Sequence, residues 1–286
     1  MKNFFKGWYY KIQSENTSIA FIPSMNVDSL GCAAACLQIV TPSFSDCANF
    51  DYSEFFADEK GSLPLVRVGR SEFSENGLKL DIKTDSHRIS GELHFGAPAK
   101  PKYDIMGPFS LLPFMECRHS VFSMLHSVGG SLEIDGQLLD FDNCVGYIEG
   151  DRGRSFPSEY LWTQYISKER SVMLSVAEIP FAGARFTGIL GFVFTDGHEY
   201  RIATYLGARV KSLRNGKAVI RQGAFTLTAE LLSDGALPLA APINGSMARF
   251  IHENISCRAH YMFWKNDEVL LDFETGRAGF EYEYKK

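Results

Sequence analysis

The sequence predicts an all-β protein made of two β-barrel halves packed together, with few short helices. The 286 residues include 23 Phe and 12 Tyr, and aromatic side chains suit the half-buried surface of a strand. Many short segments alternate apolar and polar residues, with turn signals between them. Amphipathic helix patterns are nearly absent, and residues 50–59 could form one short helical turn.

Residues 78–83 and 87–95 show the alternation most clearly, as expected of strands with one face in water. Asn-Gly and Asp-Gly pairs separate several such segments and are typical of tight hairpin turns. These pairs are Asn76-Gly77, Asp135-Gly136, Asp196-Gly197 and Asn215-Gly216. The remaining strands are expected near residues 8–12, 18–23, 34–40, 119–126, 131–134, 137–141, 160–166, 171–178, 185–194, 199–206, 211–213, 218–221, 225–232, 249–253, 257–264, 268–273 and 278–284.

The strands fall into two groups of about eight on either side of residue 145, enough for two barrels of the ligand-holding kind. We therefore expect an N-terminal barrel over residues 1–145 and a C-terminal barrel over residues 146–286. Residues 96–116 form a long, apolar connection with four prolines. A connection of this kind is expected to line or cover a cavity, or to pack between the two halves.

Composition and the absence of known motifs argue against several classes of function. The net charge of −5, with scattered Lys and Arg, argues against nucleic-acid binding. No secretory signal and no integral membrane segment are recognised, so a cytoplasmic location is expected. The six cysteines are expected to be reduced, and the seven histidines show no metal-ligand spacing, so no metal is predicted. No nucleophile elbow, phosphate loop or dinucleotide fingerprint is present. The oligomeric state is not indicated.

Three stretches are more specific than a β scaffold requires: residues 5–11 (FKGWYYK), 113–119 (PFMECRH) and 146–164 (GYIEGDRGRSFPSEYLWTQ). The third places five charged residues in a glycine-rich segment before an aromatic strand: Glu149, Asp151, Arg152, Arg154 and Glu159. Neighbouring acids and arginines can shift one another's pKa, so that a carboxyl group there could act as a general acid. The alternative is a salt-bridged turn that joins two domains.

These three stretches, in this order, resemble hallmark blocks of the tocopherol cyclase family. Similar stretches at residues 175–180, 203–208 and 241–247 extend the resemblance over essentially the whole chain. It implies a lipocalin-like architecture, related to carotenoid hydratase and Diels–Alderase proteins. It also implies cyclisation of a prenylated quinol to a chromanol, with no cofactor: an acid protonates the alkene and the phenol oxygen captures the cation. The partner is then an apolar small molecule.

The chain departs from the family pattern at two positions, with Gly150 in place of a lysine and Arg152 in place of a tryptophan. The candidate acids are Asp151 and Glu149, followed by Glu116 and His119. His119 could equally be a core histidine, and simple core packing is as plausible as a wall role for Trp8, Tyr9 and Trp162. The candidate substrate-binding residues are Trp8, Tyr9, Tyr147, Arg152, Phe156, Trp162 and Gln164.

Two functions from different classes remain open. One is a cyclase or related isomerase acting on a prenylated quinol or a similar lipophilic isoprenoid. The other is a non-catalytic, lipocalin-like carrier of an apolar small molecule, since a fold does not determine a function. A hydratase, in which water captures the cation, is a third and weaker possibility.

Overall fold

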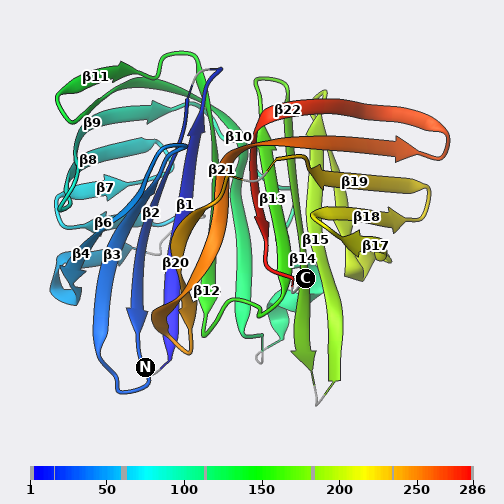
Figure 1. The fold of residues 1–286 in the computed structure, drawn as a ribbon, viewed down its shortest axis with the longest axis horizontal. Coiled ribbons are helices and arrows are strands. Elements are labelled where there is room, and N and C mark those ends of the chain that lie inside the picture. Colours follow the sequence, from blue (N-terminus) through cyan, green and yellow to red (C-terminus); the bar gives the residue numbers. More distant parts are fainter. Residues whose placement is uncertain are drawn as a thin grey trace. The chain divides into compact units, whose positions relative to one another are not determined.

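The structure is a computed structural model that describes residues 3–15, 17–58, 63–112, 115–181, 184–233 and 235–284. The prediction of an all-β fold is confirmed: strands β1 to β22 form two large antiparallel sheets (Figure 1). Helical structure in the described residues is limited to the short 3-10 helices η1 (Tyr52–Glu54), η2 (Gly107–Leu111) and η3 (Thr204–Leu206). The first of these lies within residues 50–59, where one helical turn was expected.

The first sheet has the strand order β4-β3-β2-β1-β12-β10-β9-β8-β7-β6-β5, with β11 paired to β10. Strands adjacent in sequence mostly pair as hairpins. The pairing of β1 with β12 instead joins the first and the last strand of this sheet in chain order. The bounds are β1 (Phe4–Gln13), β2 (Ser18–Val27), β3 (Ala33–Val40), β4 (Ser45–Asp51), β5 (Phe55–Asp58), β6 (Leu65–Val68), β7 (Ser71–Phe73), β8 (Gly77–Lys83), β9 (Arg88–Phe95), β10 (Cys117–Ile134), β11 (Gln137–Asp140) and β12 (Cys144–Gly153).

One face of this sheet carries the hydrophobic core of the first unit. Strand β1 contributes Trp8, Tyr10 and Ile12, which alternate with residues on the opposite face. They belong to one buried cluster with side chains from strands as distant in the sheet order as β3 and β6. The sheet must therefore curl around its own core face.

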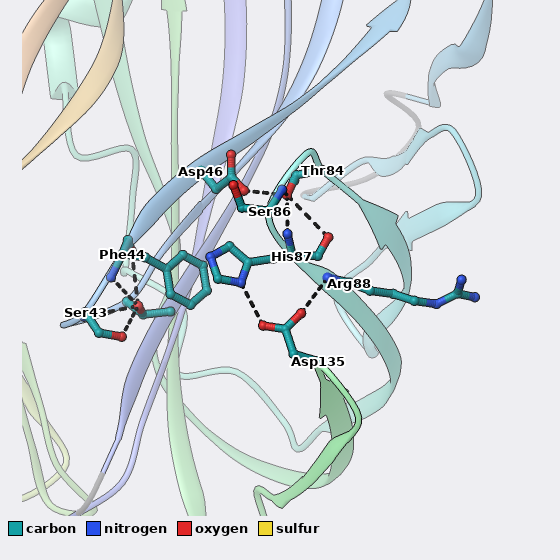
Figure 2. A network of polar contacts seen from close by, with 9 residues as sticks. Ser43, Phe44, Asp46, Thr84, Ser86, His87, Arg88 and Asp135 are labelled. Atoms are coloured by element: carbon teal, nitrogen blue, oxygen red, sulfur yellow. Dashed lines mark hydrogen bonds and ion pairs between the residues drawn. The ribbon is translucent and has the colours of Figure 1, made fainter.

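A polar network at one end of this sheet joins strands that are far apart in the strand order (Figure 2). Thr84, in the turn between β8 and β9, donates a hydrogen bond to Asp46 of edge strand β4. The ring of His87 stacks on that of Phe44 at 3.9 Å, and its Nδ1 lies 2.7 Å from Asp135 Oδ2. These contacts hold edge strand β4 beside the β8–β9 and β10–β11 turns.

The second sheet has the order β16-β15-β14-β13-β22-β21-β19-β18-β17, with β20 paired to β21. Its buried core contains side chains from β13 to β16, β18, β19, β21 and β22, such as Leu161, Val193 and Phe263. The bounds are β13 (Tyr160–Ile166), β14 (Arg170–Phe181), β15 (Ala184–Thr195), β16 (His198–Ala203), β17 (Arg209–Arg214), β18 (Lys217–Gln222), β19 (Phe225–Leu231), β20 (Leu237–Ile243), β21 (Ser246–Lys265) and β22 (Glu268–Tyr282).

Two compact units divide the chain, and each is built from more than one segment. The first comprises Met1–Asp104, Phe114–Phe156 and Leu239–Phe250, and the second Ile105–Pro113, Pro157–Pro238 and Ile251–Lys286. The expected boundary after residue 145 falls inside β12, which pairs on both sides with strands of the first unit.

The long connection predicted at residues 96–116 contains η2 and no strand before β10 in its described part. Ile105 and Met106 are buried, and the Ile105 carbonyl accepts a hydrogen bond of 3.0 Å from the Tyr205 hydroxyl. Its expected role at a cavity stays a prediction. Within the described residues, no helix has the length and apolarity needed to cross a bilayer.

Gly146 on β12 is needed for packing inside the first unit. A Cβ at this position would lie 2.1 Å from Nε2 of His126, whose buried ring is held by Ser123 and lies 4.6 Å from the ring of Phe95. The ring has little freedom to move away, so overpacking is expected there.

We predict that Gly146→Ala lowers the free energy of unfolding by about 1–3 kcal/mol. The matched control is Gly276→Ala on β22, where an added Cβ meets nothing within 4 Å. Urea denaturation of both variants and the wild type gives the comparison. Equal midpoints for Gly146→Ala and the wild type would contradict the packing argument.

Candidate functional site

The candidate site lies on three adjacent strands of the first sheet, with β12 between β1 and β10 (Figure 1). The register places His119 of β10 directly opposite Asp151 of β12, and Tyr9 of β1 directly opposite Glu149. Tyr147, Glu149 and Asp151 alternate along β12 and therefore share one face of the sheet. This face is opposite to the one that carries the core residue Ile148.

His119 lies between two carboxylates. Its Nδ1 is 3.1 Å from Asp151 Oδ1, and its Nε2 is 3.4 Å from Glu149 Oε2. The His119 and Glu149 side chains are almost fully buried, with 11% and 7% of each exposed, whereas Asp151 retains 23%. The ring thus bridges two acids in a site that holds little water.

The two carboxylates collect further donors. The Tyr147 hydroxyl donates a hydrogen bond of 2.6 Å to Glu149 Oε2, and the Cys117 thiol lies 3.4 Å from Asp151 Oδ1. Burial, together with the neighbouring acids, raises the pKa of both the Tyr147 hydroxyl and the Cys117 thiol. Both groups therefore keep their protons near neutral pH and act as donors to the acids.

The pKa of His119 is raised well above its usual value. Burial alone would lower this pKa, but the charges of Asp151 and Glu149 and their contacts with the ring outweigh burial. The ring therefore favours the imidazolium form, with a proton on each nitrogen. The two ring nitrogens are held unequally: Nδ1 lies 3.1 Å from Asp151 Oδ1, whereas the contact of Nε2 with Glu149 Oε2 is longer, at 3.4 Å.

Of the sequence-predicted catalytic residues, Glu149, Asp151 and His119 come together, and Glu116 does not join them. The Glu116 side chain is 45% exposed and lies 4.0 Å from Arg154, while its carbonyl accepts the Arg154 N–H. Glu116 therefore belongs to a surface turn that leads into β10.

The predicted substrate-binding residues are divided between faces and units. Tyr9 and Tyr147 lie on the same face as His119, whereas Trp8 and Arg152 lie on the opposite face of the same strands. Phe156 follows β12 and packs edge-to-face on Phe5, with ring centroids 5.4 Å apart.

Trp162 and Gln164 lie on β13 in the second unit, and both are buried. They alternate with Leu161 and Tyr165 of that unit's core and therefore occupy the other face of the second sheet. The Gln164 amide makes no side-chain hydrogen bond within the described residues.

Two residues at the site were not among the sequence-predicted candidates. Cys117 contacts Asp151, and Lys11, which is 1% exposed, lies directly opposite Tyr147 in the strand register. Both are in the motifs that carry the family resemblance. Their spacing could have indicated both residues, because residues two apart in a strand lie on the same face. Cys117 is two residues before His119, and Lys11 is two residues after Tyr9.

His119, Glu149 and Asp151 also form a donor set whose ligand atoms lie within 4.8 Å of one another, a spacing that a metal ion could use. A single ion can take only one nitrogen of the ring, yet the two acids face different nitrogens. The raised pKa of His119 also favours a proton over a metal ion. The geometry therefore fits a bridging imidazolium better than a metal ligand set.

Comparison with known proteins finds similarity in fold. No family model matches the chain, and no curated protein matches it in sequence. The crystal structure of CghA with Sch210972 matches with a TM-score of 0.61 and 8% identity, covering 98% of this chain and 87% of that chain. A second crystal structure of CghA gives a TM-score of 0.59 and 8% identity, covering 99% and 90%. This likeness supports the lipocalin-like fold class.

The surroundings of the two histidines on β10 shift their pKa values in opposite directions. His119 should titrate above its usual value of about 6.5, whereas burial lowers the pKa of His126 to about 4. Asp151→Asn should lower the pKa of His119, because it removes the largest raising interaction. NMR titration of the ring nitrogens, assigned with His119→Gln, measures both values.

The raised pKa of His119 makes the stability of the fold depend on pH in a defined direction. The stabilisation from charged His119 is fully present below about pH 6.5 and is lost as the pH rises through the higher folded pKa. The stability difference between wild type and His119→Gln should therefore shrink at high pH. A His119 pKa at or below about 6.5 would contradict the bridging imidazolium.

Proposed function

We propose that this protein is a cofactor-independent cyclase that closes a ring in a lipophilic isoprenoid substrate, such as a prenylated quinol, by proton transfer from His119. The observation that carries the proposal is the imidazole held between Glu149 and Asp151. The Tyr147 hydroxyl, the Cys117 thiol and the His119 Nδ1 all contact a carboxylate, and the pKa of His119 is raised, which supports a proton carried on the ring. The proposed proton donor is therefore His119. The two acids orient its ring and favour the protonated form of the ring.

The reaction requires a proton to be delivered and then recovered. The Nε2–H bond breaks as a C–H bond forms on the substrate alkene, which leaves a tertiary carbocation and a neutral imidazole. The phenol oxygen forms the C–O bond to the cation, and its proton returns to the cluster. No electron is gained or lost, and substrate and product have the same mass. We assign the transferred proton to Nε2, because Nδ1 makes the shorter contact, 3.1 Å to Asp151, whereas Nε2 lies 3.4 Å from Glu149.

The surroundings of the cluster suit a cationic intermediate. In the strand register Glu149 lies between Tyr9 and Val121, both at most 9% exposed. Aromatic faces and carboxylates stabilise a nearby positive charge, and exclusion of water prevents its capture by hydroxide or water. The Tyr147 hydroxyl keeps Glu149 oriented toward His119.

The family resemblance of the sequence motifs and the fold shared with CghA both support a ligand-binding, cyclase-like role. CghA is known in a crystal structure with Sch210972, which supports a ligand site in a protein of this fold. At 8% identity the comparison supports the fold class, and the proposed substrate class depends on the cluster and the motif resemblance.

We predict that purified protein converts at least one of a panel of prenylated quinols to an isobaric chromanol, detected by mass and retention time. His119→Gln should reduce the rate about 10²–10⁴-fold, because it removes the general acid. Glu149→Gln and Asp151→Asn should also reduce it. Glu133→Gln, which alters an exposed acid elsewhere on β10, is the matched control. The rate should fall as the pH rises through the pKa of His119.

Other outcomes identify the alternatives. Tight binding of the quinols without turnover, unchanged in His119→Gln, would replace the cyclase with a carrier. A product heavier by one water would identify a hydratase. Loss of activity with a chelator, restored by a divalent metal, would contradict the proton-carrier mechanism and favour the metal arrangement.

A further inference from the structure

Two cysteines lie side by side on neighbouring strands at one edge of the first sheet. Cys36 of β3 is directly opposite Asn49 of β4, and Cys47 is two residues before Asn49 on the same strand. Both cysteines are next to core residues, Leu37 on β3 and Ala48 on β4, so both side chains leave the sheet on the face opposite the core. The Cys47 thiol donates a hydrogen bond to the Cys36 sulfur. The two sulfur atoms are therefore in contact.

The surroundings of this pair favour a thiolate on Cys36. The hydrogen bond from Cys47 lowers the pKa of Cys36 against the opposing effect of burial. The hydroxyl of Ser24, which is opposite Cys36 on β2, lies 3.1 Å from the Cys36 sulfur and lowers this pKa further. The same shared hydrogen bond, together with burial, raises the pKa of Cys47. Cys36 is therefore the better nucleophile of the two, because the thiolate is the reactive form of a cysteine.

The two thiols differ in their access to water. Cys36 is 7% exposed, whereas Cys47 is partly exposed and its sulfur lies 3.7 Å from the side-chain oxygen of the exposed Asn49. An oxidant that approaches the Cys36 sulfur must pass beside Cys47. A small oxidant, such as hydrogen peroxide, fits this route better than a bulky disulfide does.

A bond between the two sulfurs requires a small shift of strand β4. Diagonal neighbours in an antiparallel pair have Cα atoms about 7–8 Å apart, whereas a disulfide usually spans about 4.4–6.8 Å between Cα atoms. Strand β4 can make this approach because it is at the end of the strand order, with β3 as its neighbour. A disulfide that is closed under strain is more easily reduced than an unstrained one. The geometry therefore suits a reversible bond.

The position of Cys47 connects such a shift to the polar network shown in Figure 2. The backbone N–H of Cys47 donates a hydrogen bond of 2.8 Å to the side chain of Asp46, which also accepts the hydrogen bond from Thr84. A shift of Cys47 toward β3 would therefore be transmitted to the contact that holds this edge beside the β8–β9 turn.

We propose that Cys36 and Cys47 form a modification site, at which a small peroxide converts the two thiols reversibly into a disulfide. The Cys36 sulfur attacks one peroxide oxygen, so that an S–O bond forms, the O–O bond breaks and the first water leaves. The Cys47 sulfur then attacks the Cys36 sulfur, so that the S–S bond forms, the S–O bond breaks and the second water leaves. Both sulfurs are oxidised, the peroxide is reduced, and the two thiol protons leave in the water.

A small thiol reverses the modification. Two molecules of a thiol such as glutathione restore both cysteines and become joined in a disulfide of their own. This site is on strands β3 and β4, whereas the His119 cluster is on β10 and β12. The proposal is therefore independent of the proposed cyclisation.

The test is treatment of the full chain with hydrogen peroxide, followed by alkylation of the remaining thiols and peptide mapping by mass spectrometry without a reductant. The wild type should give a peptide pair linked through Cys36 and Cys47, and dithiothreitol should restore both thiols. Cys36 should be oxidised about tenfold faster than Cys32, which is exposed in the connection before β3. Cys32→Ser is the matched control, and it should form the linked peptides at the wild-type rate.

Two further variants test the order of the steps. Cys47→Ser lacks the second sulfur, so sulfenic acid should accumulate on Cys36 and be captured by dimedone. Cys36→Ser lacks the nucleophile, so Cys47 should remain a thiol under the same conditions. Sulfenic acid on Cys47 of Cys36→Ser, formed as fast as the wild-type disulfide, would overturn the assignment of Cys36 as the reacting sulfur.

Three other results would overturn the proposal as a whole. One is recovery of Cys36 and Cys47 as thiols after Cys32 has been oxidised. Another is a linked peptide that appears only in denaturant, because the folded strands then cannot make the required approach. The third is a disulfide from either cysteine to a different cysteine or to a second chain. No turnover is measured in these experiments, so their failure and the failure of the cyclase assay can be distinguished.

Discussion

The pairing of β12 with β1 on one side and β10 on the other is the interaction on which the other features depend. It brings together segments from the beginning and the middle of the chain, with Gly7, Asp151 and His119 in one row. Because side chains alternate at every residue, the same register creates two chemically different faces. One carries the buried acids and His119, and the other carries the core residue Trp8 together with Lys6, Arg152 and Arg118. A shift of one residue in any of the three strands would mix these two sets.

Burial lowers the pKa of both histidines of β10, and the neighbouring groups decide whether the net shift of each pKa is upward or downward. Both rings lose water, which by itself disfavours the imidazolium form. His119 faces two carboxylates and its pKa rises, whereas His126 has the Ser123 hydroxyl and the Phe95 ring as neighbours and its pKa falls. The strand thus contains one histidine suited to carrying a proton and one suited to neutral packing, seven residues apart.

Local chemistry made much of the fold predictable. Hairpin turns follow from residue types that accept positive φ, and three of the four predicted pairs have both residues in that region, whereas Asn76 of the fourth pair does not. The three pairs are Asp135-Gly136, Asp196-Gly197 and Asn215-Gly216. Asn244-Gly245 adopts the same conformation between β20 and β21. Long-range pairing, such as that of β1 with β12, is not encoded in local pattern and could not be read from one sequence.

The candidate site was predictable in composition and not in arrangement. The acids Glu149 and Asp151 and the base His119 were identified from their motifs, but their juxtaposition depends on the β10–β12 register. Period-two alternation separates Arg152 from Asp151, and this could have been deduced from sequence alone. The burial of each acid could not be deduced from the sequence, because the exposed position of Glu116 and the buried position of Glu149 result from tertiary packing.

The division of the chain into interleaved segments has a consequence for biosynthesis. The first unit needs residues up to Phe250, and the second begins with Ile105–Pro113 and ends at the C-terminus. Neither unit is one continuous stretch that could be completed while the ribosome is still translating the other. Synthesis proceeds at about 5–20 residues per second, so strand β1 must wait about 12–50 seconds until Phe250 has been added. Exposed edges during this interval would favour dependence on chaperones, and neither unit could be expressed alone by simple truncation.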